Sequence, residues 1–186
     1  MARVAILASG RGSNTKSLIN YFSQDYEIEV VVVGSNRNAA GVLGVAAESS
    51  IEAFHFTKDQ MNSGNLLSEL QSRKVDWVLL SGFILKIPAE IIEHFEGKMM
   101  NIHPSLLPKY GGKGMYGINV HNAVLEAKEL ESGMTIHMVT QDYDEGDVVF
   151  QASVDISECK TAEEIAAKVL ALEHEYYPKV ASAVIK

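Results

Sequence analysis

The stretch Val4-Ala5-Ile6-Leu7-Ala8-Ser9-Gly10-Arg11-Gly12-Ser13-Asn14 decides the fold class of this 186-residue chain. Residues 4–8 form a short, continuous apolar run, which is typical of a strand covered on both faces. A glycine-rich turn follows, and Ser13 is expected to cap a helix that runs to about Phe22. A buried strand, a tight turn and a helix in this order predict a βαβ unit of a parallel sheet.

The same alternation continues through the first 103 residues. Further strands are expected at residues 29–34, 53–56, 77–80 and 99–103, and helices at 42–48, around 66–70 and at 88–95. Right-handed crossovers between these strands would give an open parallel sheet. Because such sheets bind ligands at the carboxyl ends of their strands, functional residues are expected at 9–14, at 81–87 and from His103 onward.

The pattern changes after His103. Residues 104–117 are rich in Gly and Pro and read as a long loop, followed by a helix at about 120–130. Two strand-like runs at 134–139 and 148–154 are expected to pair antiparallel, and Thr161 with Glu164 forms a capping box for a final helix running towards Pro178. The predicted fold is one doubly wound α/β domain: a mostly parallel sheet, an antiparallel C-terminal strand pair and a C-terminal helix.

Composition narrows the class of protein. Lys and Arg number 16 and Asp and Glu 24, so the net charge of −8 disfavours nucleic acid and anionic membranes as partners. Cys159 is the only cysteine, which excludes an intramolecular disulfide and disfavours a cysteine-based zinc site. The first apolar run is too short for a signal peptide, and no run approaches the ~20 residues of a membrane helix. A cytoplasmic protein is expected.

The glycine-rich turn is a candidate anion site. Free N–H groups at a helix N-terminus attract a phosphate, although an ordinary capped turn explains the same residues equally well. Dinucleotide and P-loop motifs both require glycine at position 15, where this chain has Thr15. A single phosphate therefore fits better than a pyrophosphate.

Asn101 and His103 are the strongest catalytic candidates. Residues two apart on a strand project to the same side, so an amide and an imidazole are expected together where the strand ends at Pro104. An amide can donate a hydrogen bond to an oxyanion, and histidine exchanges a proton near neutral pH. Asp144 is a possible partner that would orient His103 and raise its pKa. Taken alone, a structural histidine is at least as good an interpretation of His103, and an ordinary turn aspartate is the better interpretation of Asp144.

Three motifs together resemble the phosphoribosylglycinamide formyltransferases, which belong to the folate-dependent formyltransferases. They are SGRGSN at 9–14, NIHPSLLP at 101–108, and GMTIH at 133–137 followed by DEG at 144–146. The resemblance covers nearly the whole chain and implies a single formyltransferase domain over residues 1–186. It implies formyl transfer from 10-formyltetrahydrofolate to the amino group of glycinamide ribonucleotide, in purine biosynthesis.

The resemblance also implies roles for individual residues. Asn101 would polarise the formyl carbonyl, His103 would shuttle the proton, and Asp144 would position His103. Glycinamide ribonucleotide would be bound by Gly12, Ser13, Asn14, Pro104 and Glu173. The folate would be bound by Phe83, Ile84, Leu85, Lys86, Ile87 and Asn101, with Lys58 as the expected substitute for a basic residue near its glutamate tail. Leu85 stands where the family usually has arginine.

Other expectations are less specific. The glycine-rich segment 111–117 is either a mobile flap or a lineage-specific loop, and His137 is either a support for the site or a structural histidine. His121 is expected to cap or line the start of a helix. No metal is expected, because the histidines lack ligand spacing. The expected partners are the two small-molecule substrates, with the chain a monomer or a homodimer.

Two competing classes of function remain open. Other formyltetrahydrofolate-dependent enzymes, such as methionyl-tRNA formyltransferase or formyltetrahydrofolate hydrolase, share the Asn/His motif but normally carry an additional domain. A non-catalytic phosphate-binding module would use only the glycine-rich turn and would tolerate replacement of His103.

Overall fold

A computed structural model describes residues 1–186 and contains one seven-stranded sheet in the order β3-β2-β1-β4-β5-β6-β7. The strands are β1 (Ala2–Leu7), β2 (Ile28–Ser35), β3 (Glu52–His55), β4 (Trp77–Ser81), β5 (Met99–His103), β6 (Glu131–Met138) and β7 (Val148–Asp155). The pairs from β3 to β5 are parallel, whereas β5–β6 and β6–β7 are antiparallel. The expected fold class is confirmed.

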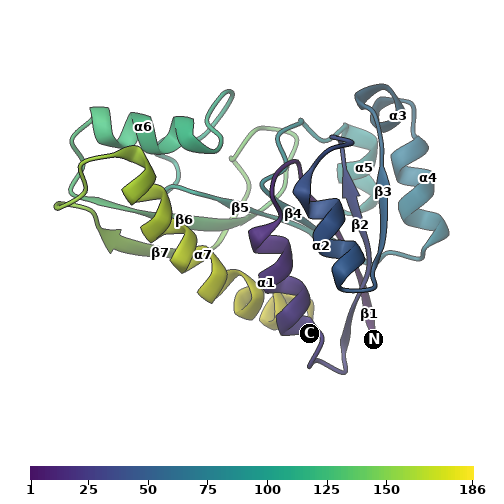
Figure 1. Ribbon diagram of the computed structural model, residues 1–186. Helices are drawn as coiled ribbons and strands as arrows, with labels where there is room; N and C mark the ends of the chain where they lie inside the picture. Colours follow the sequence, from purple (N-terminus) through teal and green to yellow (C-terminus); the bar gives the residue numbers. More distant parts are fainter.

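Helices cover both faces of this sheet. They are α1 (Ser13–Phe22), α2 (Gly41–Glu48), α3 (Lys58–Asn62), α4 (Asn65–Ser72), α5 (Ala89–His94), α6 (Ile118–Glu126) and α7 (Ala162–Ile185). Figure 1 shows α1, α2 and α7 in front of the sheet, with α4 on the other side. Two apolar clusters fill the spaces between the layers: one joins the sheet to α1, α2, α6 and α7, and the other joins it to α3, α4 and α5. The strand order reverses between β1 and β4, which is the usual ligand-binding crevice of such sheets.

The final helix continues past Pro178 to Ile185, further than the sequence pattern indicates. A proline inside a helix has no N–H for the carbonyl four residues earlier, which here belongs to His174. The hydroxyl of Ser17 on α1 donates to that carbonyl at 3.0 Å and so replaces the missing bond. The contact between α1 and α7 therefore allows the helix to pass through the proline.

Helix boundaries differ from expectation at three other places. Gly12, in a left-handed conformation (φ 89°), is the N-cap of α1, so Ser13 is the first helical residue and not its cap. Helix α6 begins at Ile118 and ends at Glu126, earlier than the predicted 120–130. The short helix α3 was not expected; the side chain and backbone of Thr57 form a capping box with Gln60 that starts it.

Candidate active site

Two cavities meet at the carboxyl ends of β4 and β5. The larger, of about 710 Å³, lies between the glycine-rich turn, the end of β5, segment 112–118 and α7. Such a volume suits a ligand of nucleotide size. The smaller, of about 70 Å³, lies between segment 83–87 and the turn 139–144. Four residues line both cavities: Phe83, Asn101, Tyr143 and Asp144.

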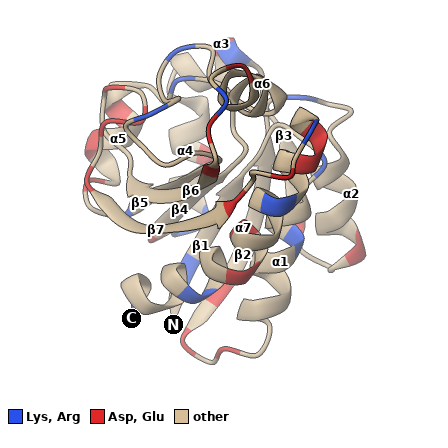
Figure 2. Cartoon of the chain, turned by 90° about the vertical axis from the view of Figure 1, so that its left-hand side faces the viewer, with Lys and Arg blue, Asp and Glu red and all other residues tan.

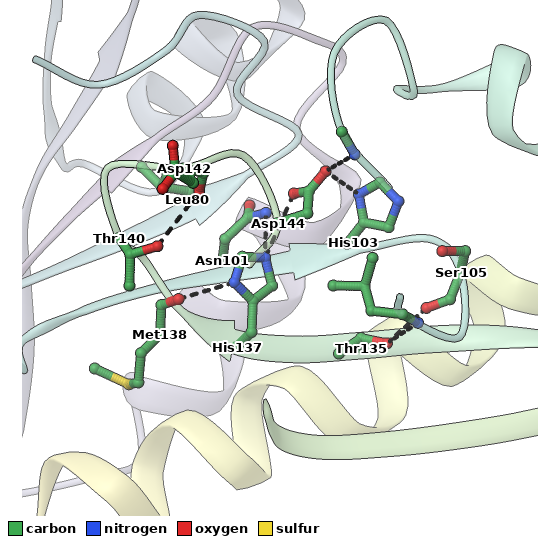
Figure 3. A network of polar contacts seen from close by, with 12 residues as sticks. Leu80, Asn101, His103, Ser105, Thr135, His137, Met138, Thr140, Asp142 and Asp144 are labelled. Carbon is green, nitrogen blue, oxygen red and sulfur yellow. Dashed lines mark hydrogen bonds and ion pairs between the residues drawn. The ribbon is translucent and has the colours of Figure 1, made fainter. Parts of the chain in front are cut away.

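Strand β5 brings Asn101 and His103 to this junction. Both residues line the larger cavity, as the spacing of two along a strand predicts. The loop after β5 is fixed by Thr135 of β6, whose hydroxyl donates to the carbonyl of Ser105 at 2.6 Å and accepts from the N–H of Leu107 at 3.0 Å. These bonds hold the chain just past His103 against the neighbouring strand (Figure 3).

The imidazole of His103 is buried, with both nitrogens facing polar groups. Its Nε2 lies 2.8 Å from the carbonyl oxygen of Tyr110, and since a carbonyl only accepts, Nε2 carries the proton. Its Nδ1 lies 3.6 Å from Oδ2 of Asp144. Burial lowers the pKa of His103, and although the charge of Asp144 raises this pKa as expected, the effect of burial is larger and the net pKa is lowered. A proton gained by neutral His103 goes to Nδ1, beside Asp144.

Asp144 lies between two histidines. Besides His103, its Oδ1 lies 3.6 Å from Nε2 of His137, and the backbone N–H of Gly112 donates to Oδ2 at 2.8 Å. Burial pushes the pKa of Asp144 upward, but the two histidines and this N–H together bring it below its ordinary value. Asp144 has a left-handed conformation (φ 56°), which aspartate tolerates better than most residues. The carboxylate is therefore charged near neutral pH; the N–H of Gly112 holds it, and it faces His103 and His137.

His137 orients the amide of Asn101. Its Nδ1 lies 2.9 Å from the carbonyl of Met138 and must donate to it, which leaves Nε2 of the neutral ring as an acceptor. Nδ2 of Asn101 lies 3.0 Å from that Nε2 and donates to it. One amide hydrogen is thereby engaged and the other remains for a ligand. Of the two interpretations from sequence, the contacts favour His137 as a support for the site (Figure 3).

The opposite wall of the larger cavity combines the glycine-rich turn with α7. Nδ2 of Asn14 donates to Oε2 of Glu173 at 2.6 Å, and this is the only protein hydrogen bond of the Glu173 carboxyl group. Burial raises the pKa of Glu173 to about 7. Oδ1 of Asn14 is buried and has no hydrogen-bond partner. This wall thus presents the Glu173 carboxyl group, which has only one protein donor, whereas Oδ1 of Asn14 is enclosed.

The residues expected to bind glycinamide ribonucleotide line the larger cavity, with one exception. Ser13, Asn14, Pro104 and Glu173 line the larger cavity. Gly12 is not part of its lining, because it packs against α2; a Cβ at this position would lie 2.8 Å from the Cα of Val42. Gly12 therefore shapes the turn while its neighbours face the cavity.

The expected folate segment divides between the cavities. Leu85, Lys86 and Ile87 line the smaller one, Ile84 the larger one, and Phe83 both. The ammonium group of Lys86 lies 5.6 Å from the ring centroid of Tyr143, across the smaller cavity. Lys58 lines neither cavity, since it begins α3 beyond β3.

Several groups at the site were not anticipated from the sequence. The backbone N–H of Gly112 and the carbonyl of Tyr110 carry no side-chain signal, so only the unusual glycine content of 111–117 marked this segment. In the sequence, only the position of Tyr143 next to Asp144 connects it with the site. The guanidinium groups of Arg11 and Arg37, which line the larger cavity without an ion-pair partner, were likewise missed.

Charges of both signs are spread over the helices and loops in the view of Figure 2. None of the helices is both long and apolar enough to cross a bilayer. Two arginines at one cavity of an acidic chain thus mark a local site for an anion.

Comparison with known proteins agrees with this geometry. The sequence profile described as formyl transferase matches residues 2–181. A chloroplastic phosphoribosylglycinamide formyltransferase of Arabidopsis thaliana is 37% identical over 98% of this chain, which spans only 65% of that protein. The phosphoribosylglycinamide formyltransferase of Haemophilus influenzae is 33% identical, and 97% of this chain aligns with 85% of it.

A solved structure shares the fold. The crystal structure of phosphoribosylglycinamide formyltransferase from Anaplasma phagocytophilum superposes with a TM-score of 0.90 at 33% identity, over 99% of this chain and 87% of that one. The chain therefore belongs to the formyl transferase family, within which phosphoribosylglycinamide formyltransferases are its similar relatives.

Proposed function

We propose that this protein transfers the formyl group of 10-formyltetrahydrofolate to the amino group of glycinamide ribonucleotide. The observation that carries the proposal is the junction of two cavities at Asn101 and Asp144. A transfer between two ligands needs both to reach one reacting centre, and the junction provides a place for it. The names of the similar relatives support this choice of donor and acceptor.

The larger cavity suits the acceptor. Free N–H groups of the glycine-rich turn at Ser13 and Asn14, together with Arg11 and Arg37, would bind its phosphate. Ribose hydroxyls would supply the hydrogen-bond donors that the Glu173 carboxyl group lacks. The amino end would then point towards His103, beside Pro104.

The smaller cavity marks the place where the flat pterin ring of a folate would enter, and its volume of about 70 Å³ must widen to hold the ring. Leu80, Phe83, Leu85, Ile87 and Val139 supply apolar walls. Asn101 at its inner end would place an amide N–H beside the formyl oxygen. Lys58 does not line this cavity, and its contact with the glutamate tail of the folate remains a prediction.

The transfer itself would use three side chains. The acceptor nitrogen forms a bond to the formyl carbon, and the carbonyl electron pair moves to oxygen, where the N–H of Asn101 stabilises it. Nδ1 of His103 takes a proton from the acceptor nitrogen, and the charge of Asp144 stabilises the imidazolium. The bond to N10 then breaks and N10 receives the proton, which gives formylglycinamide ribonucleotide and tetrahydrofolate.

The test follows the folate product spectroscopically with the purified protein. We expect product from 10-formyltetrahydrofolate only when glycinamide ribonucleotide is added. Product without any acceptor would indicate a hydrolase, and product with methionyl-tRNA instead would indicate the tRNA enzyme. No turnover, but binding of the ribonucleotide, would indicate a non-catalytic module.

Three predictions from the sequence accompany this proposal. That no metal takes part is tested by unchanged activity in a chelator. A cytoplasmic location and a monomer or homodimer are tested by fractionation and by sedimentation of the full chain.

A further inference from the structure

His121 on α6 is a buried histidine without a hydrogen-bond partner. His121 is only 5% exposed, and its Nδ1 is fully enclosed and has no hydrogen-bond partner. No other group of the protein bonds to Nε2 either, although the two other buried histidines, His103 and His137, both have partners. Buried polar groups are nearly always paired, so an unpaired imidazole requires an explanation.

The position of His121 offers that explanation. It is the fourth residue of α6, directly after the glycine-rich segment, and it lines the larger cavity together with His103 and Glu173. Burial lowers the pKa of His121, and a proton on His103 lowers it further. His121 is therefore neutral near pH 7, and it lies at the end of the cavity where His103 acts.

A neutral imidazole has one donor and one acceptor nitrogen. It is a poor partner for a phosphate, and Arg11, Arg37 and Lys113 already provide cations in the cavity. The glycinamide group offers an amide carbonyl that accepts, and an amide and an amine that donate. These are the complementary groups expected at the end of the cavity next to His103.

We propose that His121 binds the glycinamide part of the acceptor through a hydrogen bond, a role that rests on the proposed function. Because Nδ1 is enclosed, Nε2, which is not enclosed and has no protein partner, would make this bond. Residues that are kept unpaired for a ligand lower stability and raise affinity. If His121 were only structural, replacing it would destabilise the fold and leave the preference for glycinamide ribonucleotide over ribose 5-phosphate unchanged.

The experiment compares two ligands that differ by the glycinamide group. Glycinamide ribonucleotide and ribose 5-phosphate are titrated calorimetrically into wild type and His121→Phe, which keeps a ring and removes both nitrogens. We expect His121→Phe to bind glycinamide ribonucleotide about tenfold more weakly, the loss of one ordinary hydrogen bond. Binding of ribose 5-phosphate should stay within about twofold of wild type, and the Tm of the ligand-free variant should not fall.

His174→Phe is the matched control. His174 also has a buried, unpaired Nε2, but it lines neither cavity, so both affinities should be unchanged. Unchanged binding of glycinamide ribonucleotide by His121→Phe would overturn the role of His121, and so would an equal loss for both ligands. If His121→Phe does not fold, the affinities for glycinamide ribonucleotide and ribose 5-phosphate are compared in His121→Ala instead. Wild type that binds ribose 5-phosphate but not glycinamide ribonucleotide would instead contradict the proposed function.

Discussion

Asp144 shows how much a single residue depends on neighbours that are distant in sequence. Its carboxylate lies between His103 of β5 and His137 of β6, and the N–H of Gly112 holds one of its oxygens. Gly111 allows the close approach, because a Cβ there would lie 3.3 Å from the Cβ of Asp144. One aspartate thus supports the proton-carrying imidazole and lies against the histidine that orients Asn101.

Removing either member of the His103–Asp144 pair should abolish most turnover without unfolding the protein. For His103→Ala and Asp144→Asn we expect kcat to fall by about 10²–10³, the usual effect of losing a proton-transfer or charge-stabilising group. Single-turnover formation of tetrahydrofolate measures the chemical step. Thermal unfolding of both variants serves as the control, and near-wild-type rates in a folded variant would contradict the assigned roles.

Glu173 should make the ligand-free protein less stable as the pH rises. Its pKa is about 7 in the folded protein, compared with an ordinary value of 4.5, so the folded state binds the proton more tightly. The stabilisation is complete below pH 4.5 and is lost as the pH rises through 7; a shift of this size corresponds to about 3 kcal/mol. Glu173→Gln removes this dependence.

Denaturant unfolding of wild type and Glu173→Gln at pH 5 and pH 8 tests that prediction. Between pH 5 and pH 8, wild type should lose free energy of unfolding relative to Glu173→Gln. The same variant should show a higher KM for glycinamide ribonucleotide, because an amide replaces a carboxylate acceptor. An identical pH dependence in both proteins would show that Glu173 is not the titrating group.

At the scale of helices and strands, local sequence predicted most elements because their signals are local. The capping box of Thr161 and Glu164 starts α7 as expected, with the N–H of Glu164 bonded to Thr161 at 3.2 Å. The end of α7 was missed because the bond from Ser17 that compensates for Pro178 comes from another helix. Helix α3 was missed because five residues are too few to show a helical period.

The turn that carries Asp144 depends on Gly146. A Cβ at Gly146 would lie 1.8 Å from the carbonyl oxygen of Met138, so this turn has no room for a side chain. Gly146→Ala should displace the turn, lower kcat by at least about tenfold, as a 1 Å misplacement of a catalytic group does, and lower Tm. Steady-state kinetics and thermal unfolding measure both effects.

Gly44 provides the comparison for this substitution. It is exposed within α2, and a Cβ there meets no atom within 4 Å. Gly44→Ala should stabilise the protein by about 0.5–1 kcal/mol, because alanine favours the helix, and leave kcat unchanged. Equal changes of kcat and Tm in Gly146→Ala and Gly44→Ala would contradict the steric argument.

At the scale of the whole molecule, the prediction of a single domain has a thermodynamic test. The sheet is continuous through seven strands, and α7 packs on α1, α6, β6 and β7. We expect one unfolding transition with a calorimetric enthalpy of about 130 kcal/mol for 186 residues. Circular dichroism and the fluorescence of Trp77, which lies on central strand β4, should give the same midpoint. Two separate transitions would indicate two domains.

The site was less predictable than the fold, for a reason that concerns the whole chain. Asn101, His103 and Asp144 could be named from their motifs, but the net pKa of His103 depends on how deeply the complete fold buries it. Lys58 has a suitable charge for the folate's glutamate tail, but it begins α3 and lines neither cavity, so sequence alone could not show whether it reaches the site. The unpaired state of His121 is likewise a property of the packed molecule.

Tyr177 links α7 to strands β4 and β5. It lies one helical turn after Glu173, and its buried hydroxyl donates to the carbonyl of Leu80 at 2.9 Å and lies 3.4 Å from that of Met100, the residue before Asn101. Glu173 on α7 and Asn101 on β5, the two groups proposed to bind the ribose and the formyl oxygen, are thereby tied to one rigid spacer. If the proposed function holds, this spacer sets the length of the acceptor: an amine one methylene longer would overshoot the reacting carbon even with its sugar and phosphate bound correctly.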